Sequence, residues 1–109
     1  MKTKLLLLMS ILSLFGCGRK PAPEYPADVL TLRDGSQATL TFFKHASLAI
    51  TVGGKYIYVD PVSSYADHAS LPKADVVLIT HPHYDHLARP AAAPLLTPHT
   101  QLPCDRPSA

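Results

Sequence analysis

Alternating apolar and polar positions between residues 28 and 60 predict four β-strands joined by tight turns. Asp34-Gly35 marks the first turn and Gly53-Gly54 the last, because glycine adopts the positive φ angles that short hairpin turns need. Strands that follow one another through such turns favour an antiparallel sheet. The strands are expected over residues 28–32, 37–43, 47–52 and 55–60.

A fifth strand is expected over residues 76–80, where Val76-Val77-Leu78-Ile79 is apolar throughout. A run without alternation is typical of a strand that is buried on both faces. Pro61 ends the strand before it, since proline cannot donate a hydrogen bond to a sheet. Residues 62–75 are expected to form an irregular or short helical connection.

The first sixteen residues have the order of a secretory signal peptide. Lys2 and Lys4 form a basic start, and a mainly apolar run from Leu5 to Phe15 follows. This run is shorter than the about 20 residues that span a bilayer. Residues 1–16 are therefore assigned to export and not to the fold.

Leu14-Phe15-Gly16-Cys17 resembles a bacterial lipobox, in which cleavage precedes the cysteine and its thiol is acylated. Residues 17–27 would then be a lipid anchor and a proline-rich linker. The implied location is the bacterial cell envelope, where a protein held to the membrane by its lipid faces the periplasm or the cell exterior. The alternative is an ordinary signal peptide with a coincidental cysteine.

Charge and cysteine content exclude two classes of protein. The chain has 10 Lys and Arg against 8 Asp and Glu, and without Lys2 and Lys4 the two signs are equal. No basic surface for nucleic acid is therefore indicated. With Cys17 acylated, Cys104 has no partner in the chain, which excludes a disulfide framework. The oligomeric state is left open.

Residues 89–109 differ in character from the body at 28–88, with five prolines among 21 residues. They show no periodicity of 2 or 3.6, and an interior proline costs a helix about 3 kcal/mol. This segment is predicted to be disordered and without a helix. Its abrupt change in composition suggests a frame change or a premature end in the coding sequence.

Three imidazoles and one carboxylate lie within six positions, directly after the predicted fifth strand: His81, His83, Asp85 and His86. These are the ligand types that zinc and similar divalent ions prefer. In extended backbone, residues two apart point to the same side, so His81 and His83 can bind one ion together. Asp85 and His86 follow after a turn and are expected to hold a second ion. A surface loop that is rich in histidine by chance is the alternative.

The spacing His-x-His-x-Asp-His resembles the signature of the metallo-β-lactamase superfamily. Residues 42–50 and 53–61 are similar to the opening of one branch, which includes L-ascorbate-6-phosphate lactonase-like and N-acylphosphatidylethanolamine phospholipase D-like hydrolases. The shared features are a His before a small residue, an amphipathic strand, Gly-Gly, and a strand that ends in Asp-Pro. The resemblance covers about residues 39–88.

The resemblance implies an α/β fold, namely the N-terminal part of a four-layer αββα sandwich with mainly antiparallel strands. It assigns His81 and His83 to a first metal, Asp85 and His86 to a second, and a catalytic contact with the attacking water to Asp85. Asp60 would brace the metal loop by hydrogen bonding, although a plain turn residue is equally compatible. His45 would lie near the mouth of the site and contact substrate, or else be structural. No role is expected for His68 and His99.

The chemistry implied by this resemblance is metal-assisted hydrolysis of a small-molecule ester, lactone, amide or phosphodiester. One or two Zn²⁺ ions are expected, with Mn²⁺ or Fe as alternatives. The superfamily completes its site with a later His, a bridging Asp and a final His, and no residue after His86 has that context. Two further hypotheses therefore stand beside the hydrolase: a membrane-tethered zinc-binding or interaction module, and a fragment without function.

Overall fold

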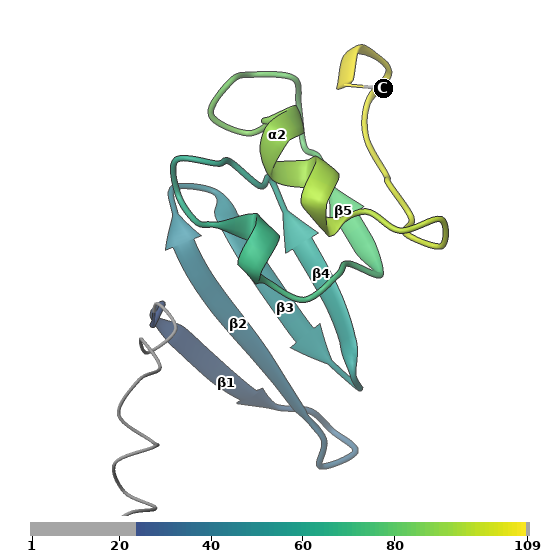
Figure 1. Ribbon diagram of the computed structural model, residues 1–109. Helices are drawn as coiled ribbons and strands as arrows, with labels where there is room; N and C mark the ends of the chain where they lie inside the picture. Colours follow the sequence, from purple (N-terminus) through teal and green to yellow (C-terminus); the bar gives the residue numbers. More distant parts are fainter. Residues whose placement is uncertain (1–23, 109) are drawn as a thin grey trace, which may run out of the picture.

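The computed structural model describes residues 24–108, which form a five-stranded sheet with short helical segments over one face (Figure 1). The order of the strands in the sheet is their order in the chain: β1 (Ala27–Thr31), β2 (Gln37–Lys44), β3 (Ser47–Val52), β4 (Lys55–Val59) and β5 (Val76–Leu78). The first four strands pair antiparallel, and β5 pairs parallel to β4. The five predicted strands are confirmed, and the sheet is mixed and mostly antiparallel.

The predicted signal peptide at 1–16 and the lipidation site at Cys17 lie outside the described residues. Within residues 24–108, no helix has the length and the apolar character needed to cross a membrane. The proposed division of the chain at residues 17–27, 28–88 and 89–109 stays a prediction.

Tight turns set the register of the antiparallel strands. The β3–β4 hairpin turns at Gly53 and Gly54, whose φ angles are +55° and +73°, and Val52 pairs directly with Lys55 on either side. A side chain at either glycine would strain this left-handed backbone. The turn therefore places the alternating residues of β3 and β4 on consistent faces of the sheet.

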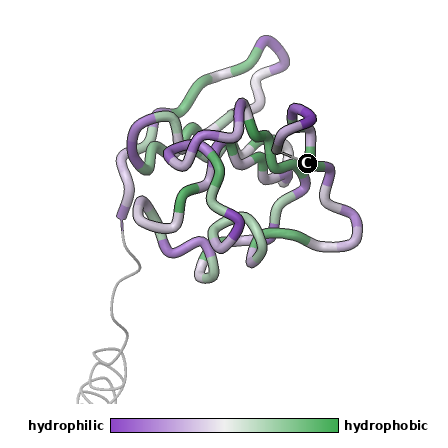
Figure 2. Tube along the Cα trace, turned by 90° about the horizontal axis from the view of Figure 1, so that it is seen from above, coloured by the Kyte–Doolittle hydropathy of each residue, from purple (hydrophilic) through white to green (hydrophobic). Residues whose placement is uncertain are grey.

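One face of the sheet carries the core. Ala49, Tyr58 and Val77 from the strands pack with Leu95 from a helical segment near the C-terminus. The Tyr58 hydroxyl donates a hydrogen bond of 2.7 Å to the Pro72 carbonyl. Burial, with a smaller contribution from Tyr56, raises the pKa of Tyr58 to about 12, so this hydroxyl keeps the proton that it donates. In Figure 2, several hydrophobic stretches run through the middle of the trace and outlying turns are largely hydrophilic.

The opposite face of the sheet is also apolar but only partly covered. The strand register brings six side chains together there: Leu40, Phe42, Leu48, Ile50, Ile57 and Val59. None of the six is fully buried, and Phe42 is 39% exposed. The described residues thus form one covered and one open sheet surface.

The expectation that prolines prevent a helix after residue 88 is wrong. Helix α2 spans Arg89–Ala92 and the 3-10 helix η2 spans Ala93–Leu95, each with its proline in the first turn. Proline is tolerated there because the N–H that it lacks would have no partner within the helix. A further 3-10 helix, η3, spans Arg106–Ser108.

The segment for which disorder was predicted supplies part of the core. Leu95 is fully buried, and Ala91 and Ala92 are buried beside it. Beyond the helices, the carbonyls of Gln101 and Pro103 accept hydrogen bonds of 2.9 and 3.1 Å from the backbone N–H groups of Val77 and Ile79. The chain therefore runs beside β5 and satisfies its outer edge.

His68 is buried between the sheet and α2, in the short 3-10 helix η1 (His68–Ser70) of the connection that was predicted to be irregular or helical. Its ring lies against Phe43 and Tyr58, at centroid distances of 5.5 and 6.5 Å. Neither ring nitrogen has a hydrogen-bond partner among the described residues. Burial lowers the pKa of His68 below 6.5, and the Ala66 carbonyl and Asp67 oppose this shift only in part.

We expect Leu95→Ala to lower the free energy of unfolding by about 2–5 kcal/mol, the usual cost of truncating a fully buried leucine. Leu96→Ala is the matched control, because Leu96 is 38% exposed and should cost much less. Urea unfolding of the two variants measures the difference. Equal, small losses would show that this segment does not pack against the sheet.

We expect the stability to fall as the pH is lowered through about 6.5, the ordinary pKa of histidine. The folded pKa of His68 lies below the unfolded value, so the unfolded chain binds more protons in the interval between them. This contribution to stability is therefore complete above pH 6.5 or so and is lost as the pH falls. Urea unfolding at several pH values should show a weaker dependence in His68→Phe than in wild type, whereas His99→Phe should behave as wild type.

Candidate metal centre

The carboxyl ends of β4 and β5 position the candidate site. These strands are parallel neighbours with Val59 opposite Leu78, so the residues that follow them leave the sheet at the same edge. Asp60 follows β4, and its backbone N–H donates a 2.9 Å hydrogen bond to the Leu78 carbonyl. Thr80 and the histidine-rich loop 81–86 follow β5. Segments that are some twenty residues apart in sequence thereby meet.

Asp60 ties the loop to the sheet. Its carboxylate is fully buried and accepts hydrogen bonds from the Thr80 N–H (2.8 Å) and the Thr80 hydroxyl (2.7 Å). The same carboxylate lies 2.7 Å from Nδ1 of His86. These contacts satisfy a charge that would be costly to bury alone. They are the contacts that a residue bracing the metal loop would make.

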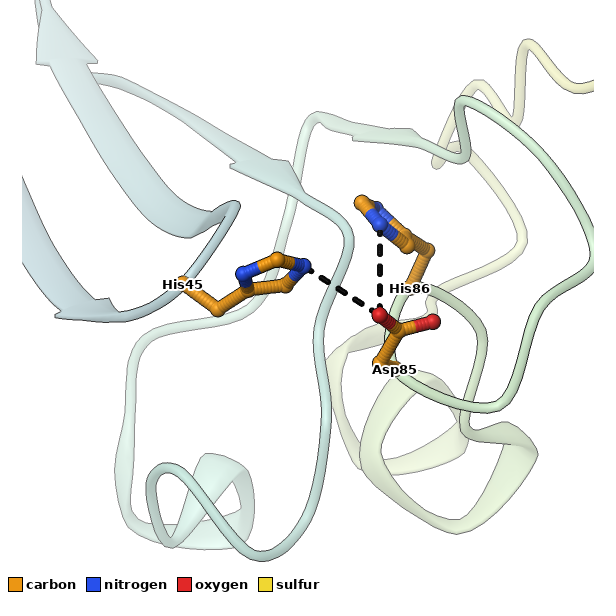
Figure 3. Close-up of side chains that lie close together, drawn as sticks. All are labelled: His45, Asp85 and His86. Atoms are coloured by element: carbon orange, nitrogen blue, oxygen red, sulfur yellow. Dashed lines mark ion pairs between the residues drawn. The ribbon is translucent and has the colours of Figure 1, made fainter.

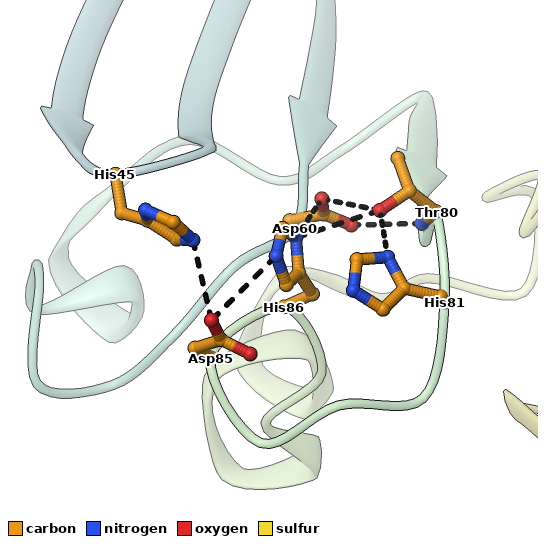
Figure 4. Close-up of polar contacts among 6 residues, drawn as sticks. All are labelled: His45, Asp60, Thr80, His81, Asp85 and His86. Carbon is orange, nitrogen blue, oxygen red and sulfur yellow. Dashed lines mark hydrogen bonds and ion pairs between the residues drawn. The ribbon is translucent and has the colours of Figure 1, made fainter.

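The hydrogen bonds around Thr80 assign the protons on two imidazoles (Figure 4). The Thr80 hydroxyl has one proton, which it donates to Asp60, so it accepts at 2.9 Å from Nδ1 of His81. His86 likewise presents Nδ1 to the Asp60 carboxylate. When Nδ1 carries the proton, Nε2 of a neutral imidazole keeps its lone pair. Both rings therefore have Nε2 available as a ligand atom.

Two groups of three potential ligands share Asp85. One group is His81, His83 and Asp85, and the other is His45, Asp85 and His86; in each, one donor atom per residue lies within 4.8 Å of the others. The His81 ring centroid lies 4.6 Å from that of His83 and 3.8 Å from that of His86. The four predicted ligand residues are thus brought together in space.

His45 reaches this cluster from the turn between β2 and β3. Its Nε2 lies 3.2 Å from Oδ2 of Asp85, and Nε2 of His86 lies 3.7 Å from the same oxygen (Figure 3). The side chains of His45 and Asp85 are 51% and 31% exposed, so a small molecule can reach them. The other two histidines are elsewhere, since His68 is buried in the core and His99 is exposed in a turn near the C-terminus.

Sequence reasoning overlooked Thr80. Its place immediately before the first histidine, at the end of a strand, was the available signal. The structure shows that its single hydroxyl links Asp60 to His81, so one threonine connects the buried carboxylate to an imidazole of the cluster.

The residues present fit a divalent metal ion. Imidazole nitrogen and carboxylate oxygen are the donors found in zinc sites, and other first-row ions accept the same set. Hydrogen bonds from outside the cluster orient two of the imidazoles, as in established metal sites. The chemistry of the donors does not choose between zinc, manganese and iron.

The chain is similar in sequence to proteins that are named as metal-dependent hydrolases. A UPF0173 metal-dependent hydrolase of Flavobacterium johnsoniae is 49% identical over 53 residues, which are 44% of this chain and 24% of that protein. A second, from Cupriavidus necator, is 30% identical over 110 residues, covering 88% of this chain and 37% of the relative. The chain thus spans well under half the length of these relatives.

A solved structure supports the same relationship. The crystal structure of a predicted metal-dependent hydrolase from Parabacteroides distasonis matches with a TM-score of 0.76 and 40% sequence identity. The match covers 78% of this chain and 39% of that protein. The described sheet is therefore a part of a fold seen in a hydrolase of this kind.

The family match extends past the histidine loop. Residues 39–101 match the family model of the beta-lactamase superfamily domain. A frame change near residue 89 does not agree with this match, because the proline-rich residues 89–101 lie inside it. With the match spanning more than half of its residues, and with the histidine–aspartate cluster at the carboxyl ends of β4 and β5, the chain belongs to the beta-lactamase superfamily.

Proposed function

We propose that this chain carries metal-binding residues of a metal-dependent hydrolase, with His81 and His83 holding one divalent ion and Asp85 and His86 a second. One observation carries the proposal. Hydrogen bonds to Thr80 and Asp60 occupy Nδ1 of His81 and His86, which leaves Nε2 of each ring available to a metal ion beside Asp85. A hydrogen-bonded frame of this kind is what a metal site requires of the residues around its ligands. Zn²⁺ is the proposed ion, with Mn²⁺ or Fe as alternatives.

A bound divalent ion would supply Lewis acidity, which polarises a carbonyl or phosphoryl oxygen and makes water acidic. Asp85 lies at the centre of the cluster and is partly exposed, so its carboxylate can orient an attacking water and accept its proton. Asp60 is fully buried and holds Thr80 and His86 in place without reaching substrate. No serine or cysteine nucleophile is needed.

The proposed substrates are small molecules with an ester, lactone, amide or phosphodiester bond. An open site that lies at a sheet edge suits a small molecule, and the relatives are named as metal-dependent hydrolases. Within the superfamily, the order of His-small residue, Gly-Gly and Asp-Pro supports the lactonase-like branch. A catalytically inactive zinc-binding module is the second candidate, since residues 45–86 contain every ligand of both groups.

We further propose that the protein is a lipoprotein of the bacterial cell envelope, anchored through Cys17. The support is the basic start, apolar run and small residue before Cys17 in the sequence.

We expect the variant His81→Ala/His83→Ala to bind Zn²⁺ at least about 100-fold more weakly than wild type, because even residues that only orient ligands contribute 10–100-fold. Equilibrium dialysis with metal analysis measures the binding, and hydrolysis of nitrophenyl esters, lactones and phosphodiesters measures activity. Both should be lost together in this variant and retained in the control His99→Ala. Zinc uptake that the double substitution leaves unchanged would contradict the proposed site. Binding without hydrolysis of any substrate would favour the zinc-binding module.

We expect globomycin, which blocks lipoprotein signal peptidase, to cause accumulation of a precursor in bacteria that produce the full chain. Cys17→Ser should prevent acylation, and Cys104→Ser should leave it intact. Gel mobility and incorporation of labelled palmitate are the measurements. Normal maturation in the presence of globomycin would contradict the lipid anchor.

A further inference from the structure

We propose that β1 is an interface strand, through which two copies of this chain pair edge to edge into one continuous sheet. β1 ends the sheet on one side, at the opposite end of the strand order from β5 (Figure 1). All five of its residues are exposed, and no other segment of residues 24–108 pairs with its outer edge. An exposed strand edge is a template for pairing with another chain.

The hydrogen bonds between β1 and β2 show which backbone groups of β1 point outward. The Phe42 N–H donates to the Pro26 carbonyl at 2.8 Å. The Leu32 N–H donates to the Ser36 carbonyl at the other end of the pair, also at 2.8 Å. In an antiparallel pair, such inward-directed positions alternate with outward-directed ones. The N–H and C=O groups of three residues therefore point away from β2: Ala27, Val29 and Thr31.

The outer edge of β1 lacks the features that usually prevent strands from associating. Proteins protect open edges with lysine, with proline or with bulges, and β1 has no lysine. The adjacent Pro26 directs its backbone toward Phe42, so the N–H that it lacks leaves the outer edge complete. The bulge in this part of the sheet lies between β2 and β3. Val29 and Leu30 are 56% and 52% exposed, so pairing would also cover apolar side chains.

The outward groups make β1 complementary to itself. Two antiparallel strands exchange hydrogen bonds only where outward-directed residues face each other. With Val29 opposite its own copy, Ala27 faces Thr31, and all three outward residues of both strands pair at once. A register in which Ala27 faces Val29 would put Asp28 opposite Asp28, and like charges directly opposite are destabilising. Val29 therefore lies on the two-fold axis, and Asp28 faces Leu30.

The charges beyond the paired residues also suit a second copy. In this register Arg33 of one copy lies across from Tyr25 and beside Glu24 of the other, so a cation approaches an aromatic ring and a carboxylate. Asp34 comes near the same end, but its carboxylate accepts hydrogen bonds from the Ser36 N–H (3.0 Å) and hydroxyl (2.6 Å). The two-fold axis repeats this contact at the other end. An unrelated peptide would meet the same outward groups without this match of register and charge.

Disulfide cross-linking of the full chain tests this register. All variants carry Cys104→Ser, and the chain without a new cysteine measures the background, including any from Cys17. Facing residues with outward-directed N–H groups have Cα atoms about 5.5 Å apart, within reach of a disulfide. On mild oxidation with copper phenanthroline, Val29→Cys should therefore give a covalent dimer at least about 10-fold above background.

Leu30→Cys is the matched control, because Leu30 is about as exposed as Val29. The two copies of Leu30 would be diagonal neighbours about 7–8 Å apart, which is too far for a disulfide. This variant should therefore stay near background. Random collisions would cross-link both variants equally.

Sedimentation of the purified full chain in mild detergent measures association without a cross-link. Wild type should be a dimer, and Val29→Pro should weaken its dissociation constant at least about 10-fold, since two hydrogen bonds are lost per dimer. Proline is tolerated on an edge strand whose N–H faces solvent, so the melting temperature of the dilute, dissociated chain should not fall. Val29→Thr keeps the N–H and the branched side chain and should remain a dimer.

Three results would overturn the proposal: a monomeric wild type, equal cross-linking of Val29→Cys and Leu30→Cys, or a disulfide of Val29→Cys with a different protein. Because β1 contributes none of the candidate metal ligands, none of these results would count against the proposed metal-dependent function. That function is tested separately by the binding of Zn²⁺ to His81→Ala/His83→Ala.

Discussion

The buried carboxylate of Asp60 is the constraint on which the rest of the site depends. It is fully excluded from water, and three donors from Thr80 and His86 satisfy its oxygens. An uncompensated charge at this position would be strongly destabilising, so the end of β4 and the histidine loop are bound to one arrangement. That arrangement requires β5 to pair parallel to β4 with Val59 opposite Leu78. The orientation of His81 and His86 is therefore a consequence of the sheet.

The helical layer holds β5 in that place. Leu95 and Ala92 pack on Val77 and Tyr58, and the backbone of Gln101 and Pro103 pairs with the outer edge of β5. The proline-rich residues after the loop thus support the strand from which the loop emerges.

 

The candidate site joins three segments that are far apart in sequence. The turn between β2 and β3 brings His45 to within 3.2 Å of Asp85, which belongs to the loop after β5. Asp60 follows β4 and Thr80 follows the parallel strand β5, and the Asp60 carboxylate accepts a hydrogen bond from the Thr80 N–H. The candidate ligands thus lie in turns at one edge of the sheet, while the residues that orient them lie at the ends of strands. His45 and Asp85 stay accessible to small molecules, while the Asp60 carboxylate is buried.

The sequence by itself determined the strands, their turns and the set of four candidate ligands at 81–86, because alternation, glycine pairs and ligand spacing are local properties. Only the tertiary structure decided the parallel pairing of β5, the role of Thr80 and the approach of His45 to Asp85, since each depends on contacts between residues 19 or more positions apart in the chain. The helix at Arg89–Ala92 was missed for a related reason. Proline is unfavourable in a helix interior but acceptable in its first turn, and burial of Leu95 against the sheet stabilises a segment whose local sequence gives no helical period.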